Sequence, residues 1–338
     1  MNKKRIGLLF GSVNSEHDIS VASAASALAH FPHDRYECVP IYISKDGKWN
    51  VGDFTPEELE TMTFTNCQEL ALTFNLDKPG FMNLVTQEPV LLDGALLVLH
   101  GQMGEGGHVQ GLLHCANIPF TGSDVLGSSL CMDKAFTHAV CESNGIKMAQ
   151  YQTIHNIAEL DMAHVNYPCI VKPTREGSSF GVTYVEDEEG LYKACEFAFK
   201  YDSKILVEEY IDGVEVGLSI LKTKNEFIIS DVDQVNVTGA VFDFQEKYHP
   251  HATETLRVST YPKTLRDAIR NQGAIIFDLL DCRHIARLDF FVTKDDQFYL
   301  NEVNTMPGFT KNSRYPMMLQ NVGVEYTELM AKMVEDIL

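Results

Sequence analysis

The sequence predicts an α/β protein of several domains, and three patterns carry this prediction. A short apolar strand at residues 5–10 leads into a loop at 11–16 and an Ala- and Ser-rich helix at 18–30. A second strand at 39–43 and a third at 94–99 follow, and the third ends in a glycine cluster. This order of strand, loop, helix and strand is typical of a parallel sheet, whose ligand-binding loops lie at the carboxyl ends of the strands.

The remaining elements continue the alternation of strands and helices. Residues 50–90 are polar and poorly periodic, so we expect a peripheral excursion from the fold there. The other predicted elements are helices at 109–116, 124–145, 191–201 and 265–280, strands at 168–172, 182–185 and 204–209, a long loop at about 235–252, and a C-terminal helix. Three domains fit this pattern best, with boundaries near 122 and 211.

Composition and charge exclude several classes of function. The 338 residues carry a formal net charge of −20, which argues against nucleic acid or an anionic membrane as a partner. The N-terminal apolar run is too short for a signal peptide, and no run approaches the length of a spanning helix. The eight cysteines form no C-x-x-C pair, which favours reduced thiols in a cytoplasmic protein.

Two apolar runs around a four-residue polar turn predict a β-hairpin over residues 287–304. In the register that closes this turn, Asp289 lies opposite Glu302 and Arg287 lies opposite Asn304. Side chains two apart along a strand share a face, so all four would meet. Two facing carboxylates repel unless a cation lies between them, and Mg²⁺ prefers such oxygen ligands. The alternative is a solvated charged strip on an exposed hairpin.

A glycine-rich loop at 175–181 joins two of the predicted strands. Its paired glycines let the backbone fold over an anion, and Ser178 and Ser179 offer hydroxyl and N–H donors to phosphate oxygens. It lacks the lysine ending of a P-loop, and an ordinary hairpin turn is the alternative. Lys172, on the preceding strand, and Lys134, on an earlier helix, are candidate phosphate cations. An exposed helical lysine is the alternative for Lys134.

The segment 208–211 ends a strand where two predicted domains meet. Backbone N–H and C=O groups beside an apolar slot would hold the edge of an adenine there, and Glu215 would accept hydrogen bonds from ribose hydroxyls. Alone, this pattern is also that of solvated acidic residues at a strand end.

His100 and the glycine cluster at 101–107 follow the third strand. A helix N-terminus here would present N–H groups to a substrate carboxylate. Glu16, in the loop after the first strand, would receive a substrate ammonium. The alternative is a tight strand-to-helix turn in which His100 makes only local hydrogen bonds.

Taken together, eight strings in register resemble the D-alanine–D-alanine ligase family of the ATP-grasp fold over nearly the whole chain. They are FGSVNSEHDIS at 10–20, HGQMGEGGHVQG at 100–111, MDK at 132–134, VKPTREGSSFGV at 171–182, EEYIDGVEVG at 208–217, FDFQEKY at 242–248, RLDFF at 287–291 and NEVNTMPGFTKNSRYP at 301–316. The resemblance implies ATP-dependent joining of two D-alanine molecules through an acyl phosphate, for peptidoglycan precursor synthesis. It also implies a Rossmann-like domain at 1–122, two domains at 123–210 and 211–338 that sandwich ATP, and a lid at 235–252.

The resemblance further implies roles for single residues. Glu16 would hold the first substrate's ammonium in a link to Ser178 and Tyr248. Arg287 and the Gly308 amide would stabilise the oxyanion. The implied ATP-binding residues are Lys134, Lys172, Ser179, Glu208, Glu209, Ile211, Glu215 and Lys247. The implied residues around the amino-acid substrates are His100, Ser313, Arg314 and Phe242. Two Mg²⁺, with Mn²⁺ as the alternative ion, would bind Asp289, Glu302 and Asn304.

Some positions depart from the family pattern. Gly106 stands where the family usually has Asp, and Arg314 where housekeeping ligases commonly have an apolar residue. With Phe242 and Phe244, Arg314 resembles the D-alanine–D-serine ligases of vancomycin-resistance type, because an arginine there would bind a serine hydroxyl. Retention of Tyr248 argues against D-lactate. D-Alanine is the expected second substrate and D-serine the alternative.

Two other classes of function stay open. Another ATP-grasp carboxylate–amine ligase would share the lysines and metal residues but not the strings at 10–20 and 100–111. A non-enzymatic nucleotide-binding protein would have no use for an oxyanion-stabilising arginine. The family resemblance also suggests a homodimer.

Overall fold

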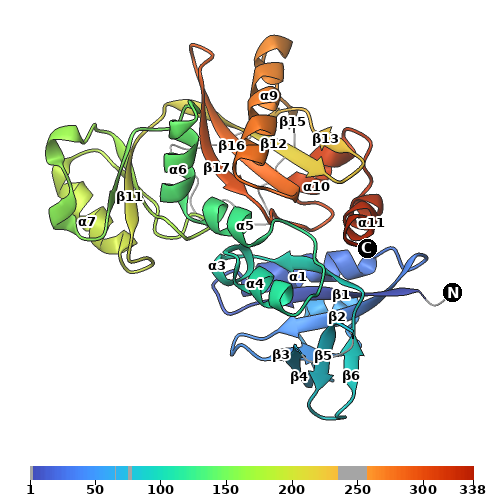
Figure 1. Ribbon diagram of the computed structural model, residues 1–338. Helices are drawn as coiled ribbons and strands as arrows, with labels where there is room; N and C mark the ends of the chain where they lie inside the picture. The colour runs from blue at the N-terminus through green and yellow to red at the C-terminus, as the bar shows by residue number, and fades with distance from the viewer. Residues whose placement is uncertain (1–2, 65, 75–77, 235–256) are drawn as a thin grey trace.

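Three β-sheets organise the computed structural model, which describes residues 3–64, 66–74, 78–234 and 257–338 (Figure 1). The first sheet has the strand order β6-β5-β4-β3-β2-β1-β7. Its parallel part consists of β1 (Lys4–Gly11), β2 (Tyr36–Ile43) and β7 (Gly94–Leu99). Helices α1 (His17–Ala29), α3 (Gln102–Glu105) and α4 (His108–Cys115) follow these strands, as the sequence predicts for a parallel α/β unit.

The expectation of a peripheral excursion at 50–90 is wrong, because this segment extends the first sheet. It forms the antiparallel strands β3 (Trp49–Val51), β4 (Gln68–Thr73), β5 (Gly80–Asn83) and β6 (Pro89–Leu91), with the short helix α2 (Pro56–Glu60) between β3 and β4. Strands β3, β5 and β6 have only three or four residues each, too few for a clear period-two pattern. Buried Leu70 and Phe81 tie the extension to the core of the sheet.

The second sheet is antiparallel and lies in the middle of the chain. Its order is β10-β9-β11-β8, formed by β8 (Tyr151–Ile154), β9 (Cys169–Pro173), β10 (Thr183–Val185) and β11 (Ile205–Glu209). Helix α7 (Glu188–Ala198) packs against it through a buried apolar cluster. The helix expected at 124–145 is two helices, α5 (Val125–Met132) and α6 (Lys134–Ser143). They divide at Asp133, whose carboxylate caps α6 by accepting from the N–H groups of Ala135 and Phe136.

The third sheet has the order β15-β14-β12-β16-β17, with β13 paired to β12. Its strands are β12 (Gly213–Lys222), β13 (Phe227–Ile229), β14 (Asp233–Gln234), β15 (Arg257–Val258), β16 (His284–Thr293) and β17 (Phe298–Asn304). Helix α9 (Lys263–Leu279) packs on this sheet, and α10 (Arg314–Gln320) lies against β12. The loop expected at 235–252 falls outside the described residues. The division into three domains and its boundaries near 122 and 211 stay predictions.

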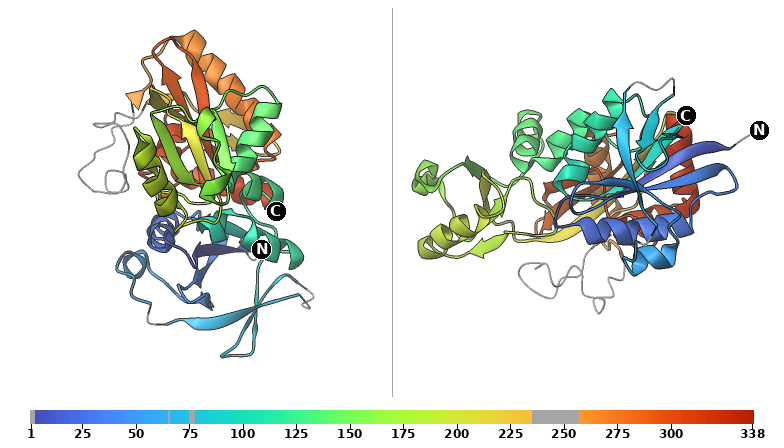
Figure 2. Two further views of the ribbon diagram at one scale, coloured as in Figure 1. Left: turned by 90° about the vertical axis from the view of Figure 1, so that its left-hand side faces the viewer. Right: turned by 90° about the horizontal axis from the view of Figure 1, so that it is seen from below.

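The last helix, α11 (Tyr326–Ile337), packs against the N-terminal part of the chain (Figure 2). It lies against β7 of the first sheet. Leu329, Met330 and Met333 share one buried cluster with Leu8 and Phe10 of β1. Leu221 of β12 and Ile285 of β16 belong to the same cluster, so the first and third sheets share a common core. Within the described residues, no helix combines the length and apolar character that a membrane crossing requires.

Candidate active site

Two adjoining cavities hold most of the residues singled out from the sequence. One cavity of about 500 Å³ lies between the second and third sheets, and the other, of about 630 Å³, lies beside the loops of the first sheet. Both are lined by Lys134, Glu176, Gly177, Ser178, Glu215 and Glu302. We name them the nucleotide cavity and the substrate cavity, after the ligands that the sequence predicts for their residues.

The structure brings the predicted residues together in two groups. The nucleotide cavity is lined by Lys134, Lys172, Ser178, Ser179, Glu208, Glu209, Ile211, Glu215 and Glu302. The substrate cavity is lined by Glu16, His100, Lys134, Ser178, Glu215, Arg287, Glu302, Asn304, Gly308, Ser313 and Arg314. Asp289 lies beneath the cavity floor, with 1% of its surface exposed. Phe242, Phe244, Lys247 and Tyr248 fall outside the described residues.

The hairpin of β16 and β17 has the expected pairing at the site but not at its turn. Asp289 lies opposite Glu302 and Arg287 opposite Asn304, as predicted. The predicted four-residue turn, closed by Thr293 and Phe298, is one residue shorter in the structure. The Thr293 N–H donates to the Gln297 carbonyl at 2.8 Å, which leaves three residues in the turn, and Phe298 pairs with Val292. A bulge next to Asp289 restores the register, and bulges commonly re-aim side chains beside functional sites.

The guanidinium groups of Arg287 and Arg314 contact the carboxylate of Asp289. Arg287 Nε lies 3.0 Å from both carboxylate oxygens, and its Nη2 donates to Oδ2 at 2.8 Å. Asn304 Nδ2 donates to Oδ2 at 3.0 Å, and Arg314 Nη1 to Oδ1 at 3.2 Å. The expected repulsion between the facing carboxylates is therefore relieved within the chain.

Asp289, Glu302 and Asn304 offer two carboxylates and an amide oxygen, which are hard donors suited to Mg²⁺. Within the residues that the structure describes, no group of three or more His, Cys, Asp or Glu side chains could hold a metal ion. The donor chemistry fits a divalent cation that keeps other ligand positions for substrate oxygens. Binding at Asp289 would displace one of its guanidinium contacts.

Arg314 connects three carboxylates. Its Nε and Nη2 donate to the two oxygens of Asp233 at 2.7 Å each, and its Nη1 reaches Glu215 at 3.1 Å as well as Asp289. Four of its five N–H donors are thus directed at acidic groups. Our sequence reasoning missed Asp233, because it lies on the two-residue strand β14 and matches no motif.

A hydrogen bond ties the glycine-rich loop to the loop between β1 and α1. Ser178 Oγ donates to the carboxylate of Glu16, which is itself buried. Ser178 and Ser179 both have left-handed backbones, with φ of 50° and 60°. Such conformations are costly for residues other than glycine and persist where the surroundings enforce them. The expected link between Glu16 and Ser178 is present.

His100 hydrogen-bonds two segments that lie far from it in the sequence, so its bonds are not the local ones of the alternative interpretation. Its Nδ1 donates to the Met306 carbonyl at 3.1 Å, and its Nε2 lies 3.1 Å from Ser23 Oγ. Burial lowers the pKa of His100 to about 4, so the ring is neutral near pH 7 and Ser23 donates to Nε2. Both ring nitrogens are engaged, although the residue does line the substrate cavity.

Glu105 is a second residue that our sequence reasoning missed. It lies in the glycine cluster, lines the substrate cavity and accepts the Gly101 N–H at 2.8 Å. Burial and the nearby Glu16 carboxylate raise the pKa of Glu105 to about 8. A carboxyl group of this kind holds a proton near pH 7 and can exchange it with a ligand.

The wall of the nucleotide cavity holds a buried ion cluster. Lys172 Nζ lies 2.7 Å from Glu208 Oε2, and His138 Nε2 lies 2.9 Å from Glu208 Oε1. Burial raises the pKa of Glu208, but Lys172 and His138 outweigh it and lower the pKa to about 2. Lys134 Nζ donates to the Glu176 carbonyl at 2.8 Å. His138, one turn after Lys134 on α6, could have been found from its i, i+4 spacing.

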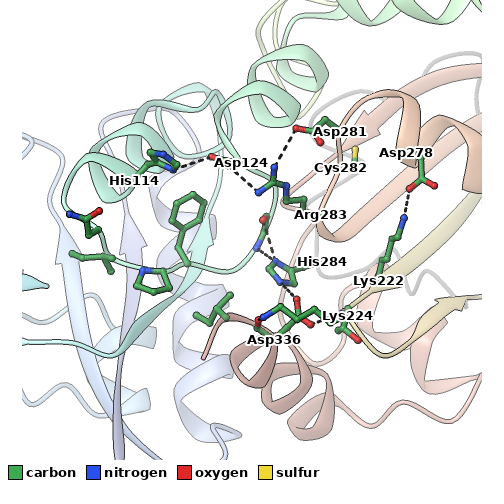
Figure 3. A pocket seen from close by; sticks show the side chains of 17 residues that line it. His114, Asp124, Lys222, Lys224, Asp278, Asp281, Cys282, Arg283, His284 and Asp336 are labelled. Atoms are coloured by element: carbon green, nitrogen blue, oxygen red, sulfur yellow. Dashed lines mark hydrogen bonds and ion pairs between the residues drawn. The ribbon is translucent and has the colours of Figure 1, made fainter. Parts of the chain in front are cut away.

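A third cavity, of about 740 Å³, lies elsewhere, at the joint between the first and third sheets (Figure 3). Its charged side chains pair with one another, as Arg283 does with Asp124 at 3.1 Å. His284 Nδ1 accepts the Gly122 N–H, and its Nε2 donates to Asp336. None of the predicted site residues lines this cavity, which belongs to the interface between the first and third sheets.

Comparisons with known proteins find similar sequences and structures along nearly the whole chain. The models "D-ala D-ala ligase N-terminus" and "D-ala D-ala ligase C-terminus" match residues 5–123 and 136–335. The vancomycin/teicoplanin A-type resistance protein VanA of Enterococcus faecium is 35% identical, over 99% of this chain and 98% of its own. The D-alanine–D-alanine ligase of Caldicellulosiruptor bescii is 33% identical, over 99% and 95%. The crystal structure of the VanG D-Ala:D-Ser ligase from Enterococcus faecalis superimposes with a TM-score of 0.89, at 30% identity and full coverage of both chains.

Proposed function

Because this chain belongs to the D-alanine–D-alanine ligase family, and is thus an ATP-dependent ligase of the ATP-grasp fold, we propose that it joins two D-alanine molecules. The dipeptide would supply peptidoglycan precursor synthesis. The observation that carries the proposal is the contact between the two cavities. The candidate phosphate lysine Lys134 and the candidate substrate residues Glu16 and Arg287 all face one continuous space.

The reaction has two steps. A carboxylate oxygen of the first D-alanine attacks the γ-phosphorus of ATP, the bond to the bridging oxygen breaks, and ADP leaves. The amine of the second D-alanine then attacks the carbonyl carbon of the acyl phosphate. The tetrahedral intermediate expels phosphate, and the amine nitrogen loses a proton, leaving the peptide bond.

The side chains of the substrate cavity suit these charge changes. Glu16, held by Ser178, would bind the ammonium of the first substrate. Arg287 and the Gly308 amide would stabilise the oxyanion, which exists only along the reaction path. The departing phosphate would take the proton released by the second substrate's amine, because Glu105, with its raised pKa, already holds a proton near pH 7.

The groups around the nucleotide support the same scheme. Lys134 and Lys172 would neutralise phosphate oxygens. Asp289, Glu302 and Asn304 would hold Mg²⁺, which when bound supplies positive charge beside the phosphates. Glu215 would take the ribose hydroxyls.

The test measures ADP formation and the mass of the product. ADP should form only when D-alanine is present, in equal amount to a dipeptide with the mass of D-alanyl-D-alanine. ATP turnover that ignores D-alanine would refute the proposal. No turnover with any D-amino acid would indicate a nucleotide-binding protein.

D-Serine is the second candidate for the second substrate. The similarity to the VanG D-Ala:D-Ser ligase and the presence of Arg314 and Phe242 favour it. In the structure, most donors of Arg314 are directed at carboxylates, which weakens a direct role with a serine hydroxyl. A competition of D-alanine, D-serine and D-lactate, read by product mass, decides between the candidates.

A further inference from the structure

The buried ion cluster beside the nucleotide cavity contains a histidine that matches none of the predicted roles. His138 lies on α6, with its side chain 2% exposed. Lys134, four residues earlier, projects from the same face of the helix. Both residues line the nucleotide cavity, so the helix presents two basic side chains to one ligand space.

The second sheet fixes the partners of this histidine. Lys172 lies opposite Leu206, two residues from Glu208, so Lys172 and Glu208 are diagonal neighbours on one face. Tyr151 lies directly opposite Glu208 on the other neighbouring strand, and its ring centroid is 4.3 Å from that of His138. His138 is therefore packed over the carboxylate.

Glu208 divides its two oxygens between two basic groups. Oε2 meets the Lys172 ammonium at 2.7 Å, and Oε1 meets His138 Nε2 at 2.9 Å. The second contact lies off the direction of a straight hydrogen bond. Among the described residues, Glu208 Oε1 and His138 Nδ1 are buried without a hydrogen-bond partner. Buried polar atoms rarely stay in that condition, so the wall is incomplete without a ligand.

We propose that His138 is a positioning residue for the nucleotide: it occupies one oxygen of Glu208 and so keeps the Lys172 ammonium directed at the ligand. Without the Nε2 contact, Oε1 would have no polar neighbour on this side, and Glu208 would turn both oxygens to Lys172, because a buried carboxylate oxygen without a polar contact is costly. The ammonium would then be drawn from the phosphates. The effect falls on nucleotide affinity and not on the chemical steps.

This inference rests on the proposed nucleotide site, and two matched variants test it. In His138→Gln the amide nitrogen reaches about as far as Nε2, whereas in His138→Asn it reaches only as far as Nδ1. We expect His138→Gln to keep the wild-type KM for ATP. We expect His138→Asn to raise this KM about tenfold, equivalent to about 1.4 kcal/mol, with kcat and the KM for D-alanine unchanged.

The control variant is His155→Gln. His155 is an exposed histidine, 3.5 Å from Glu159 and outside both cavities, and its replacement should change neither constant. Equal KM values in the two His138 variants, or a loss in kcat alone, would overturn the proposal. Failure of both variants to fold would also overturn it, because His138 would then serve the fold and not the nucleotide.

Direct titration with ADP separates this inference from the proposed ligation. If the wild-type protein binds ADP but forms no dipeptide, the proposed function fails while the His138 variants still test the inference. If the wild type forms dipeptide and His138→Asn binds ADP as tightly as the wild type, only the inference fails.

Discussion

Replacing Arg314 with methionine should remove the cation that joins Asp233, Glu215 and Asp289. The arginine side chain is 11% exposed, and those of Asp233 and Asp289 are 5% and 1% exposed. Methionine keeps most of the apolar volume, so the change mainly deletes charge and hydrogen bonds. We therefore expect the substitution to destabilise the folded protein.

The size of this destabilisation follows from the polar contacts that each carboxylate retains after the arginine is removed. Asp289 retains Arg287 and Asn304, but Asp233 loses two contacts of 2.7 Å and keeps the Gly217 N–H. Removing one partner of a buried ion pair costs about 3–5 kcal/mol. We therefore expect Arg314→Met to lower the free energy of unfolding by about that amount.

Urea denaturation measures this loss, with Arg283→Met as the matched control. Arg283 is 52% exposed and pairs with Asp124 at 3.1 Å, so its replacement should cost less than about 1 kcal/mol. The double variant Arg314→Met with Asp233→Asn should be more stable than the sum of the single effects, since no buried carboxylate is then left alone.

An Arg314→Met variant as stable as the control variant would refute this reasoning. The result also bears on substrate choice, because a D-serine preference lost in a destabilised variant would not identify a hydroxyl contact. Product ratios should therefore be compared in Arg314→Lys as well, in which the charge stays but the planar fork is lost.

Three further predictions concern single residues. Glu302→Gln should abolish most activity with an unchanged thermal melt, because it weakens metal binding at the cavity; full turnover would contradict this. The raised pKa of Glu105 means that the folded protein holds its proton more tightly than the unfolded chain. The wild type should therefore lose stability relative to Glu105→Gln, by a few kcal/mol, as the pH rises from the ordinary 4.5 to about 8, and a constant gap between their melts would speak against a raised pKa. Asp133→Ala should cost about 1–2 kcal/mol in denaturant titrations, since it removes the cap of α6 and the pair with Lys204 at 2.6 Å; a loss below about 0.5 kcal/mol would exclude both contributions.

The sequence predicted the elements whose signals are local. Strands β1 and β7 each contain an apolar run that ends at or near a glycine, and α9 has a clear helical period, so each was placed within about two residues. The facing pair of Asp289 and Glu302 followed from strand alternation together with the register set by the predicted turn. The antiparallel extension at 50–90 was missed because its short strands gain their stability from pairing, which no local pattern records.

Site residues that belong to a sequence motif could be predicted. Residues that enter the site only through tertiary packing could not. The turn of the β16–β17 hairpin and its bulge shift the register in opposite senses, so the prediction at Asp289 was right although the predicted turn was not. Glu105, His138 and Asp233 matter because of burial and of charges brought from other elements. A pKa set by burial depends on surroundings that only the folded chain provides.

The seating of α11 against β7 has a consequence for synthesis of the chain. The residues of α11 that complete the core beneath the first strands are made long after those strands, so a nascent chain on the ribosome lacks the cover for that core until α11 has emerged. Until then the apolar side chains of the first strands stay accessible to chaperones and proteases. Emergence of α11, and not emergence of the first sheet, then sets the earliest point at which this core can close.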